Sequence, residues 1–219
     1  MRGQWRLFLA ALRFVTLRSV AVGNSFDGIP PPAASRFVPL AGIVVGLTGA
    51  LVYWCGTQLW PTSVALVLSL LVTVGARIGG GDGLYPVLFF FVRYNALMAL
   101  SAAKAPFTLP EYLTLGVIMV AGHAASRALV VSVMATDRPA RLSITHLDLG
   151  IALILGFAPS ALLGIPGLIG LAAAITVRLA QSAYGWRKPI TGFAERLDIT
   201  QQLTEISFYL GALATWKYI

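Results

Sequence analysis

A stretch of forty residues, from Phe37 to Ala76, contains no Asp, Glu, Lys or Arg. A helix that crosses a bilayer needs about 20 apolar residues, because each residue adds about 1.5 Å and the hydrocarbon core is about 30 Å thick. The stretch is therefore long enough for two spans. We expect them to separate near Trp60-Pro61-Thr62-Ser63, because proline lacks a backbone donor and tryptophan favours the headgroup level.

The composition extends this prediction to the whole chain. Hydrophobic residues make up 58% of the sequence and charged residues 11%, whereas a soluble domain carries about 25% charged residues. So few charges could not cover the surface of a soluble protein with this apolar content. We predict an all-α, polytopic helical bundle of about six transmembrane helices in a single membrane domain, residues 1–219. The expected spans are 37–76 (two spans), 84–103, 112–135, 149–177 and 200–219.

Two parts of this plan leave alternatives open. The run 149–177 is long for one span, and Pro159 and Pro166 predict either a kinked helix or two short helices that meet in the membrane. In residues 1–20, Trp5 and Phe8 share a helical face flanked by arginines. This pattern is typical of an interfacial helix on an anionic leaflet, and an ordinary first helix of the bundle fits it equally well.

The distribution of basic residues predicts orientation and partners. Five arginines precede the first full span, and short positive segments stay in the cytoplasm, so we expect a cytoplasmic N-terminus. The location that we expect is the cell (inner) membrane. The net charge is +8 and the isoelectric point is about 10.2. In a membrane protein this excess reflects orientation and contact with anionic lipid, so we expect the lipid bilayer as a partner and no binding to nucleic acid.

The loop after the second span contains one acid among glycines, in Gly79-Gly80-Gly81-Asp82-Gly83. Gly81 and Gly83 let the backbone approach a ligand closely or form a nest of N–H groups for phosphate. The carboxylate of Asp82 suits Mg²⁺, which prefers oxygen ligands and commonly bridges protein to substrate phosphate. The alternative is a tight turn in which Asp82 caps the following helix.

Charged residues inside or beside the other apolar runs are further candidates, because their burial in a membrane is costly. His123 and Arg127 are four residues apart, so on a helix they share a face directed into the bundle or a wet cavity. A structural arginine near the interface is one interpretation of Arg127.

Acidic residues gather before the last run. Glu195 and Asp198 would share a face if this segment is helical, with Glu205 further along. A solvated charged segment at the mouth of the span explains them equally well. His146 and Asp148 precede the run 149–177 and are typical of a helix N-cap region with an acid that matches the helix dipole.

Four segments resemble, in order and approximate spacing, the cobalamin-5′-phosphate synthases, also called adenosylcobinamide-GDP ribazoletransferases. Residues 8–16 (FLAALRFVT) are similar to the opening segment of that family, and residues 35–46 (SRFVPLAGIVVG) to the entry of its first span. Residues 122–127 (GHAASR) resemble its mid-chain segment that ends in Ser-Arg. Residues 201–206 (QQLTEI) resemble the Gln-Gln-Leu-x-Glu of its last motif.

The resemblance implies an integral membrane transferase that joins adenosylcobinamide-GDP to α-ribazole, or its 5′-phosphate, with release of GMP. It implies Mg²⁺ as the cofactor, with Asp82 and Glu195 as catalytic and metal-binding residues. The substrate-binding residues that it implies are Arg127, Gly81, Gly83 and Glu205. A homodimer, or association with other enzymes of cobalamin assembly, is compatible with so small a chain.

The chain departs from the family pattern at the acidic motif, His-x-Asp-Gly-Leu-Ala-Asp-x-x-Asp-Gly. Gly81-Asp82-Gly83-Leu84 matches one of its three carboxylates. In a second alignment, Ala76-Arg77-Ile78-Gly79 resembles the Ser-Arg-Ile-Gly that follows the motif, and then the whole acidic loop is absent. Where the last motif has Thr-Gly-Asp, the chain has Phe193-Ala194-Glu195.

Two other functions stay open, the first because of these departures and the second without reference to the family. One is a catalytically inactive relative that binds a corrinoid or a partner enzyme in the membrane. The other is a small transporter, which glycine and proline breaks at membrane depth favour. The two halves of the chain show no internal repeat, which argues against the transporter.

Overall fold

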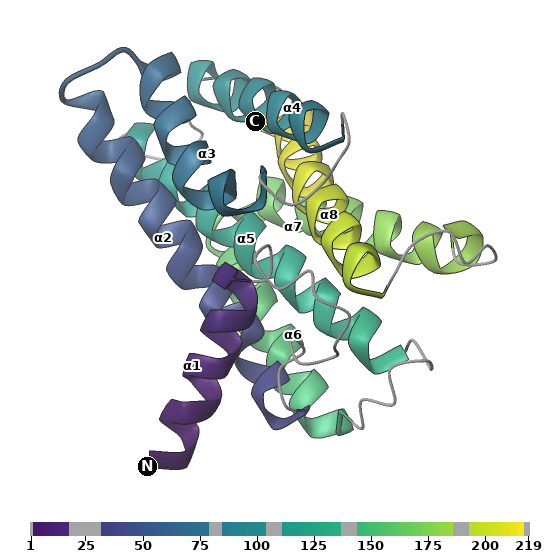
Figure 1. Ribbon diagram of the computed structural model, residues 1–219. Coiled ribbons are helices and arrows are strands. Elements are labelled where there is room, and N and C mark those ends of the chain that lie inside the picture. The colour runs from purple at the N-terminus through teal and green to yellow at the C-terminus, as the bar shows by residue number, and fades with distance from the viewer. Residues whose placement is uncertain are drawn as a thin grey trace.

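The computed structural model describes residues 2–17, 32–78, 85–103, 111–136, 144–185 and 193–216, and these form a helical bundle without strands (Figure 1). The elements are α1 (Arg2–Leu17), η2 (Pro32–Phe37), α2 (Val38–Thr57), α3 (Thr62–Ile78), α4 (Tyr85–Ala102), α5 (Glu111–Thr136), α6 (His146–Ala161), α7 (Gly164–Ala180), the π-helical turn η4 (Gln181–Gly185) and α8 (Phe193–Trp216). The prediction of an all-α bundle is confirmed.

Within the described residues, three segments are long and apolar enough to cross a membrane: Pro32–Thr57, Tyr112–Thr136 and Gly164–Ala183. Shorter apolar helices cover Thr62–Thr73, Pro86–Ala102 and His146–Ala161. Large apolar side chains point outward from several helices; Phe91 of α4, Ile154 of α6 and Leu179 of α7 are each more than 55% exposed. Such a surface is typical of contact with lipid. The chain is thus a helical membrane protein, and its number of spans stays a prediction.

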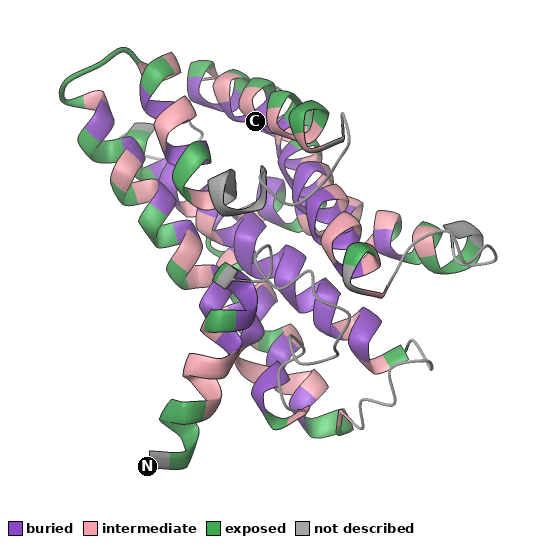
Figure 2. Cartoon of the chain, viewed as in Figure 1, coloured by how far each residue is buried: buried purple, intermediate pink, exposed green. Residues whose placement is uncertain are grey.

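Helix α5 lies at the centre of the bundle (Figure 2), and most of its apolar window is buried. Helix α2 packs closely along it, because Gly42 and Gly46 are four residues apart on the contacting face. A Cβ atom at Gly42 would lie 2.7 Å from the His123 carbonyl oxygen, and one at Gly46 would lie 2.7 Å from the Cα of Val120. Small residues at this spacing allow two membrane helices to approach at backbone distance.

The break between α2 and α3 occurs where the sequence predicted it, with α3 beginning directly after Pro61. The run 149–177 forms two helices rather than one kinked helix. Helix α6 continues through Pro159, and the chain turns at Leu162 and Leu163 before Gly164, whose φ of 60° is the left-handed conformation that glycine adopts without strain. Gly164 allows the turn, and Pro166, in the first turn of α7, lacks the backbone donor that one continuous helix would need.

Helix α1 is half inside the bundle and half outside (Figure 1). Ala11, Phe14 and Val15 are buried in an apolar cluster shared with α2, α5, α6 and α8, whereas Trp5 is 61% exposed. Helix α8 begins at Phe193, seven residues before the predicted span 200–219. Its first turns carry charged residues, so a search for apolar runs could not find its start.

Candidate functional site

Five polar side chains meet where α4, α5 and α8 pack together. They come from one position on α4, two on α5 and two on α8, and each is at most 2% exposed: Arg93, His123, Arg127, Glu205 and Tyr209. We call this set the central polar cluster. Charged groups at such depth in a membrane protein need partners, because lipid and apolar side chains cannot replace their water shell.

Glu205 is the acid of the central polar cluster. Its Oε2 lies 3.2 Å from Nη2 of Arg93 and 3.4 Å from Nδ1 of His123. Its Oε1 accepts a hydrogen bond from the hydroxyl of Tyr209, at 3.3 Å. One carboxylate therefore joins α4, α5 and its own helix through groups that are all removed from water.

The two α5 residues also contact each other. Nη1 of Arg127 lies 3.1 Å from Nδ1 of His123 and donates to the His123 carbonyl oxygen at 3.3 Å. Nδ1 of His123 therefore lies within reach of both the Arg127 guanidinium and the Glu205 carboxylate. A guanidinium can only donate, so Nδ1 accepts from Arg127 in one tautomer, and it donates to Glu205 in the other.

Helical spacing explains the local order of these residues. His123 and Arg127 are four residues apart, as are Glu205 and Tyr209, so each pair shares one face of its helix. The predicted common face of His123 and Arg127 is confirmed, and it points into the bundle. Arg93 lies alone on α4 and reaches Glu205 across 112 residues of sequence only because α4 packs on α8.

The polar face of α8 continues toward its N-terminus. Thr200, Gln201 and Thr204 are each at most 3% exposed, and the Thr204 hydroxyl donates to the carbonyl oxygen of Thr200 at 2.7 Å. Gln202 donates to Asp198 through its side-chain amide at 2.7 Å. The segment Gln201–Glu205 thus turns most of its polar groups toward the interior of the protein.

The structure brings together two of the six residues that the sequence proposed for the site. Arg127 and Glu205 belong to the central polar cluster. Glu195 is exposed in the first turn of α8, ten residues before Glu205, which corresponds to about 15 Å along a helix. Asp82, Gly81 and Gly83 lie outside the described residues. Across the described part of the chain, no three His, Cys, Asp or Glu side chains form a group that could bind a metal ion.

Sequence reasoning did not select Arg93 or Tyr209 for the site. The signal for Arg93 was present, since it is a lone positive charge in an otherwise apolar run and such residues are functional candidates. The signal for Tyr209 was its position four residues after Glu205. Neither signal identifies the partner, which depends on the packing of α4, α5 and α8.

Asp148 has a structural role at the start of α6, where His146 is the first helical residue. The backbone N–H of Asp148 donates to Oγ1 of Thr145, which is the N-cap residue, and the Thr145 hydroxyl donates to the Asp148 carboxylate at 2.7 Å. Arg36 lies 3.5 Å from the same carboxylate. The predicted N-cap region is confirmed, and Asp148 also connects α6 to η2.

Gly122 allows Tyr209 to reach Glu205, and its substitution tests the packing of the cluster. A Cβ atom at Gly122 would lie 2.4 Å from Cε1 of the Tyr209 ring. We expect Gly122→Ala to lower the free energy of unfolding by about 1–3 kcal/mol, as overpacking of a core does. Thermal unfolding in detergent measures the change.

The matched control is Gly150→Ala on α6, where a Cβ atom would meet nothing within 4 Å. We expect this variant to be as stable as the wild type or slightly more stable, because alanine favours a helix over glycine. Equal stability of the two variants would contradict the close contact between Gly122 and Tyr209.

Curated proteins resemble the chain along nearly its whole length. It is 30% identical to the adenosylcobinamide-GDP ribazoletransferase of Leptothrix cholodnii, over 95% of each chain. It is 28% identical to the protein of the same name from Shewanella amazonensis, over 96% of each chain, and 27% identical to that from Ralstonia nicotianae, over 90% of this chain and 89% of the relative. No family model and no solved structure matches the chain.

The alignments also contain gaps. The alignment with the Leptothrix protein has 259 positions, whereas 95% of the 219 residues of this chain is about 208 residues. About 50 aligned positions, the difference between 259 and 208, therefore lie opposite gaps in this chain. The relative contains internal residues that this chain lacks.

Proposed function

The chain belongs to the adenosylcobinamide-GDP ribazoletransferase family, and we propose that it joins adenosylcobinamide-GDP to α-ribazole or its 5′-phosphate in the membrane and releases GMP. The observation that carries the proposal is the relationship at 30% identity over 95% of both chains. The family assignment makes the chain a transferase enzyme; the substrates are part of the proposal.

In the proposed reaction, a hydroxyl oxygen of the ribazole attacks the phosphorus that remains attached to the corrinoid. The new P–O bond forms as the bond to GMP breaks, and the hydroxyl proton is lost. Catalysis of phosphoryl transfer depends mostly on positioning and on stabilising negative charge. An enzyme in the membrane would also keep an amphipathic corrinoid near the site.

We propose that Arg127 and Glu205 serve substrate binding from within the bundle. A guanidinium suits a phosphate because it donates several hydrogen bonds in one plane. Glu205 connects α8 to Arg93 and His123. Through these contacts it fixes the orientation of the α8 face that carries Thr200 and Gln201 relative to α4 and α5. This role is supported by the position of Glu205 in the central polar cluster.

Mg²⁺ is part of the proposal through the family resemblance alone. The described residues do not by themselves fit a magnesium site, since they contain no cluster of acidic side chains. Glu195 is exposed and offers one carboxylate. We propose Asp82 as the second carboxylate, and Gly81 and Gly83 as the loop residues that contact phosphate. All three lie outside the described residues. We also propose a location in the inner membrane with a cytoplasmic N-terminus.

Complementation tests the proposed function. We expect the chain to restore cobalamin-dependent growth in a cell that lacks its own cobalamin synthase. The purified protein in vesicles should release GMP from adenosylcobinamide-GDP only when α-ribazole or its 5′-phosphate is present. Absence of growth and of GMP release, with the protein confirmed in the membrane, would refute the enzyme and leave the inactive relative.

A further inference from the structure

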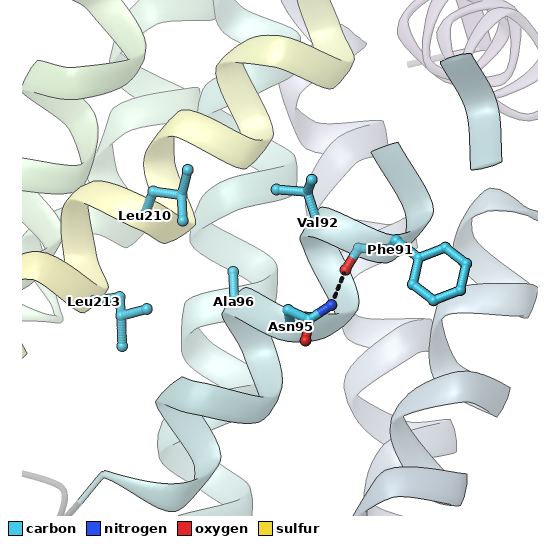
Figure 3. A pocket seen from close by; sticks show the side chains of 6 residues that line it. All are labelled: Phe91, Val92, Asn95, Ala96, Leu210 and Leu213. Carbon is cyan, nitrogen blue, oxygen red and sulfur yellow. Dashed lines mark hydrogen bonds between the residues drawn. The ribbon is translucent and has the colours of Figure 1, made fainter. Parts of the chain in front are cut away.

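Helices α4 and α8 form an outward groove that no other described part of the chain covers (Figure 3). The groove has a volume of about 280 Å³ and is lined by Phe91, Val92, Asn95, Ala96, Leu210 and Leu213. Apart from Asn95, all lining side chains are apolar, which would suit contact with lipid tails. Contact with lipid tails does not explain the polar side chain of Asn95 in this lining.

Asn95 is exposed at the middle of an apolar helix. It is the eleventh of the 18 residues of α4, two positions after Arg93, which points inward to Glu205. In the described part of the chain its amide makes one hydrogen bond, from Nδ2 to the carbonyl oxygen of Phe91 at 2.8 Å (Figure 3). The remaining amide proton and the carbonyl oxygen face outward, where lipid tails offer neither donor nor acceptor.

We propose that a second copy of this chain covers the groove and that the two copies form a symmetric dimer through α4 and α8. A carboxamide both donates and accepts, so Asn95 of one copy is complementary to Asn95 of the other across a two-fold axis. Asparagine side chains associate membrane helices in this way, because each amide otherwise lacks a partner.

The apolar part of this face is also complementary to itself. Phe91 is 59% exposed, and its ring stands off α4 on the side away from α8 (Figure 3). The outward surface of α4 thus carries a protruding aromatic side chain beside the groove, and in a two-fold dimer both would face the same surface of the other copy. A dimer at this face would also cover the outer side of α4, whose Arg93 points inward to Glu205. Helix α4 would then be supported from both sides.

The single cysteine allows a direct test, because Cys55 is exposed on α2. Donor-labelled and acceptor-labelled copies of the full chain are mixed in vesicles of phosphatidylethanolamine and phosphatidylglycerol, and energy transfer is followed as lipid dilutes the protein. We expect transfer in the wild type well above that of random proximity. Asn95→Leu should need roughly tenfold more protein per lipid for the same transfer, the range that membrane hydrogen bonds provide.

The matched control is Ile154→Ala on α6, which is 71% exposed on another face and should dimerise like the wild type. Val92→Cys in a Cys55→Ser background should form an intermolecular disulfide on oxidation, and Ile154→Cys should not. This second measurement does not depend on how well Asn95→Leu folds. Absence of transfer in the wild type would show that lipid covers the groove. Equal dimerisation of Asn95→Leu and wild type, or cross-linking at position 154 instead of 92, would also overturn the proposal.

Discussion

Arg93→Met is expected to lower the free energy of unfolding by about 3–5 kcal/mol, the cost of leaving one partner of a buried ion pair without the other. Arg93 and Glu205 are each 1% exposed, and their charged atoms are 3.2 Å apart. Without Arg93, the Glu205 carboxylate stays in the interior beside His123 and the hydroxyl of Tyr209 but loses the cation that lies 3.2 Å from it. Unfolding in detergent with increasing denaturant measures the change.

The double variant Arg93→Met with Glu205→Gln separates the charge from the packing. Because it removes both members of the pair, we expect it to recover most of the stability that Arg93→Met loses. Arg13→Met on the exposed side of α1 is the matched control for the side-chain exchange and should change the stability by less than about 0.5 kcal/mol. A double variant no more stable than Arg93→Met would show that the packing of Arg93, rather than its charge, matters.

Asp82→Asn is expected to reduce the rate of GMP release by a factor of roughly 10² to 10³ and to abolish growth in the complementation assay. The magnitude corresponds to losing a few kcal/mol of charge stabilisation by a bound metal ion. The prediction depends on the proposed function, in which Asp82 and Glu195 hold Mg²⁺. We also expect half-maximal activity of both Asp82→Asn and Glu195→Gln to require more Mg²⁺ than in the wild type.

Asp148→Asn provides a carboxylate control for this experiment. The Asp148 carboxylate accepts a hydrogen bond from Thr145 and lies 3.5 Å from Arg36 at the start of α6. Its replacement should therefore affect the stability of the protein without changing the Mg²⁺ dependence of GMP release. If Asp82→Asn keeps wild-type activity, Asp82 is a turn residue. The second alignment, in which the acidic loop is absent, would then be the correct one.

Much of the secondary structure followed from the distribution of charge. The α2–α3 break at Pro61 and the length of α5 agree with the predicted runs, because a helix in a membrane must satisfy its backbone internally and exclude charge over a fixed length. The common face of His123 and Arg127 followed from helical spacing. The start of α8 did not, because its charged first turns are helical without being apolar.

The candidate site was only partly predictable. The resemblance to the family selected Glu205 and Arg127, whereas Arg93 was not selected although it is an isolated charge in an apolar run. Nothing in the order of the residues indicates that Arg93, rather than another arginine, lies beside Glu205. That pairing depends on the packing of α4 against α8, and the approach of Tyr209 depends on the missing side chain of Gly122.

The sequence by itself determined that the chain is a helical membrane protein and where most of its helices lie, since both follow from local composition and from the thickness of a bilayer. Only the tertiary structure decided which charges neutralise one another and which polar groups face outward. The ion pair between Arg93 and Glu205 depends on helix packing, because the two residues are far apart in the sequence. Likewise, only the structure shows that Asn95 faces outward while Arg93, two residues before it, points inward to Glu205.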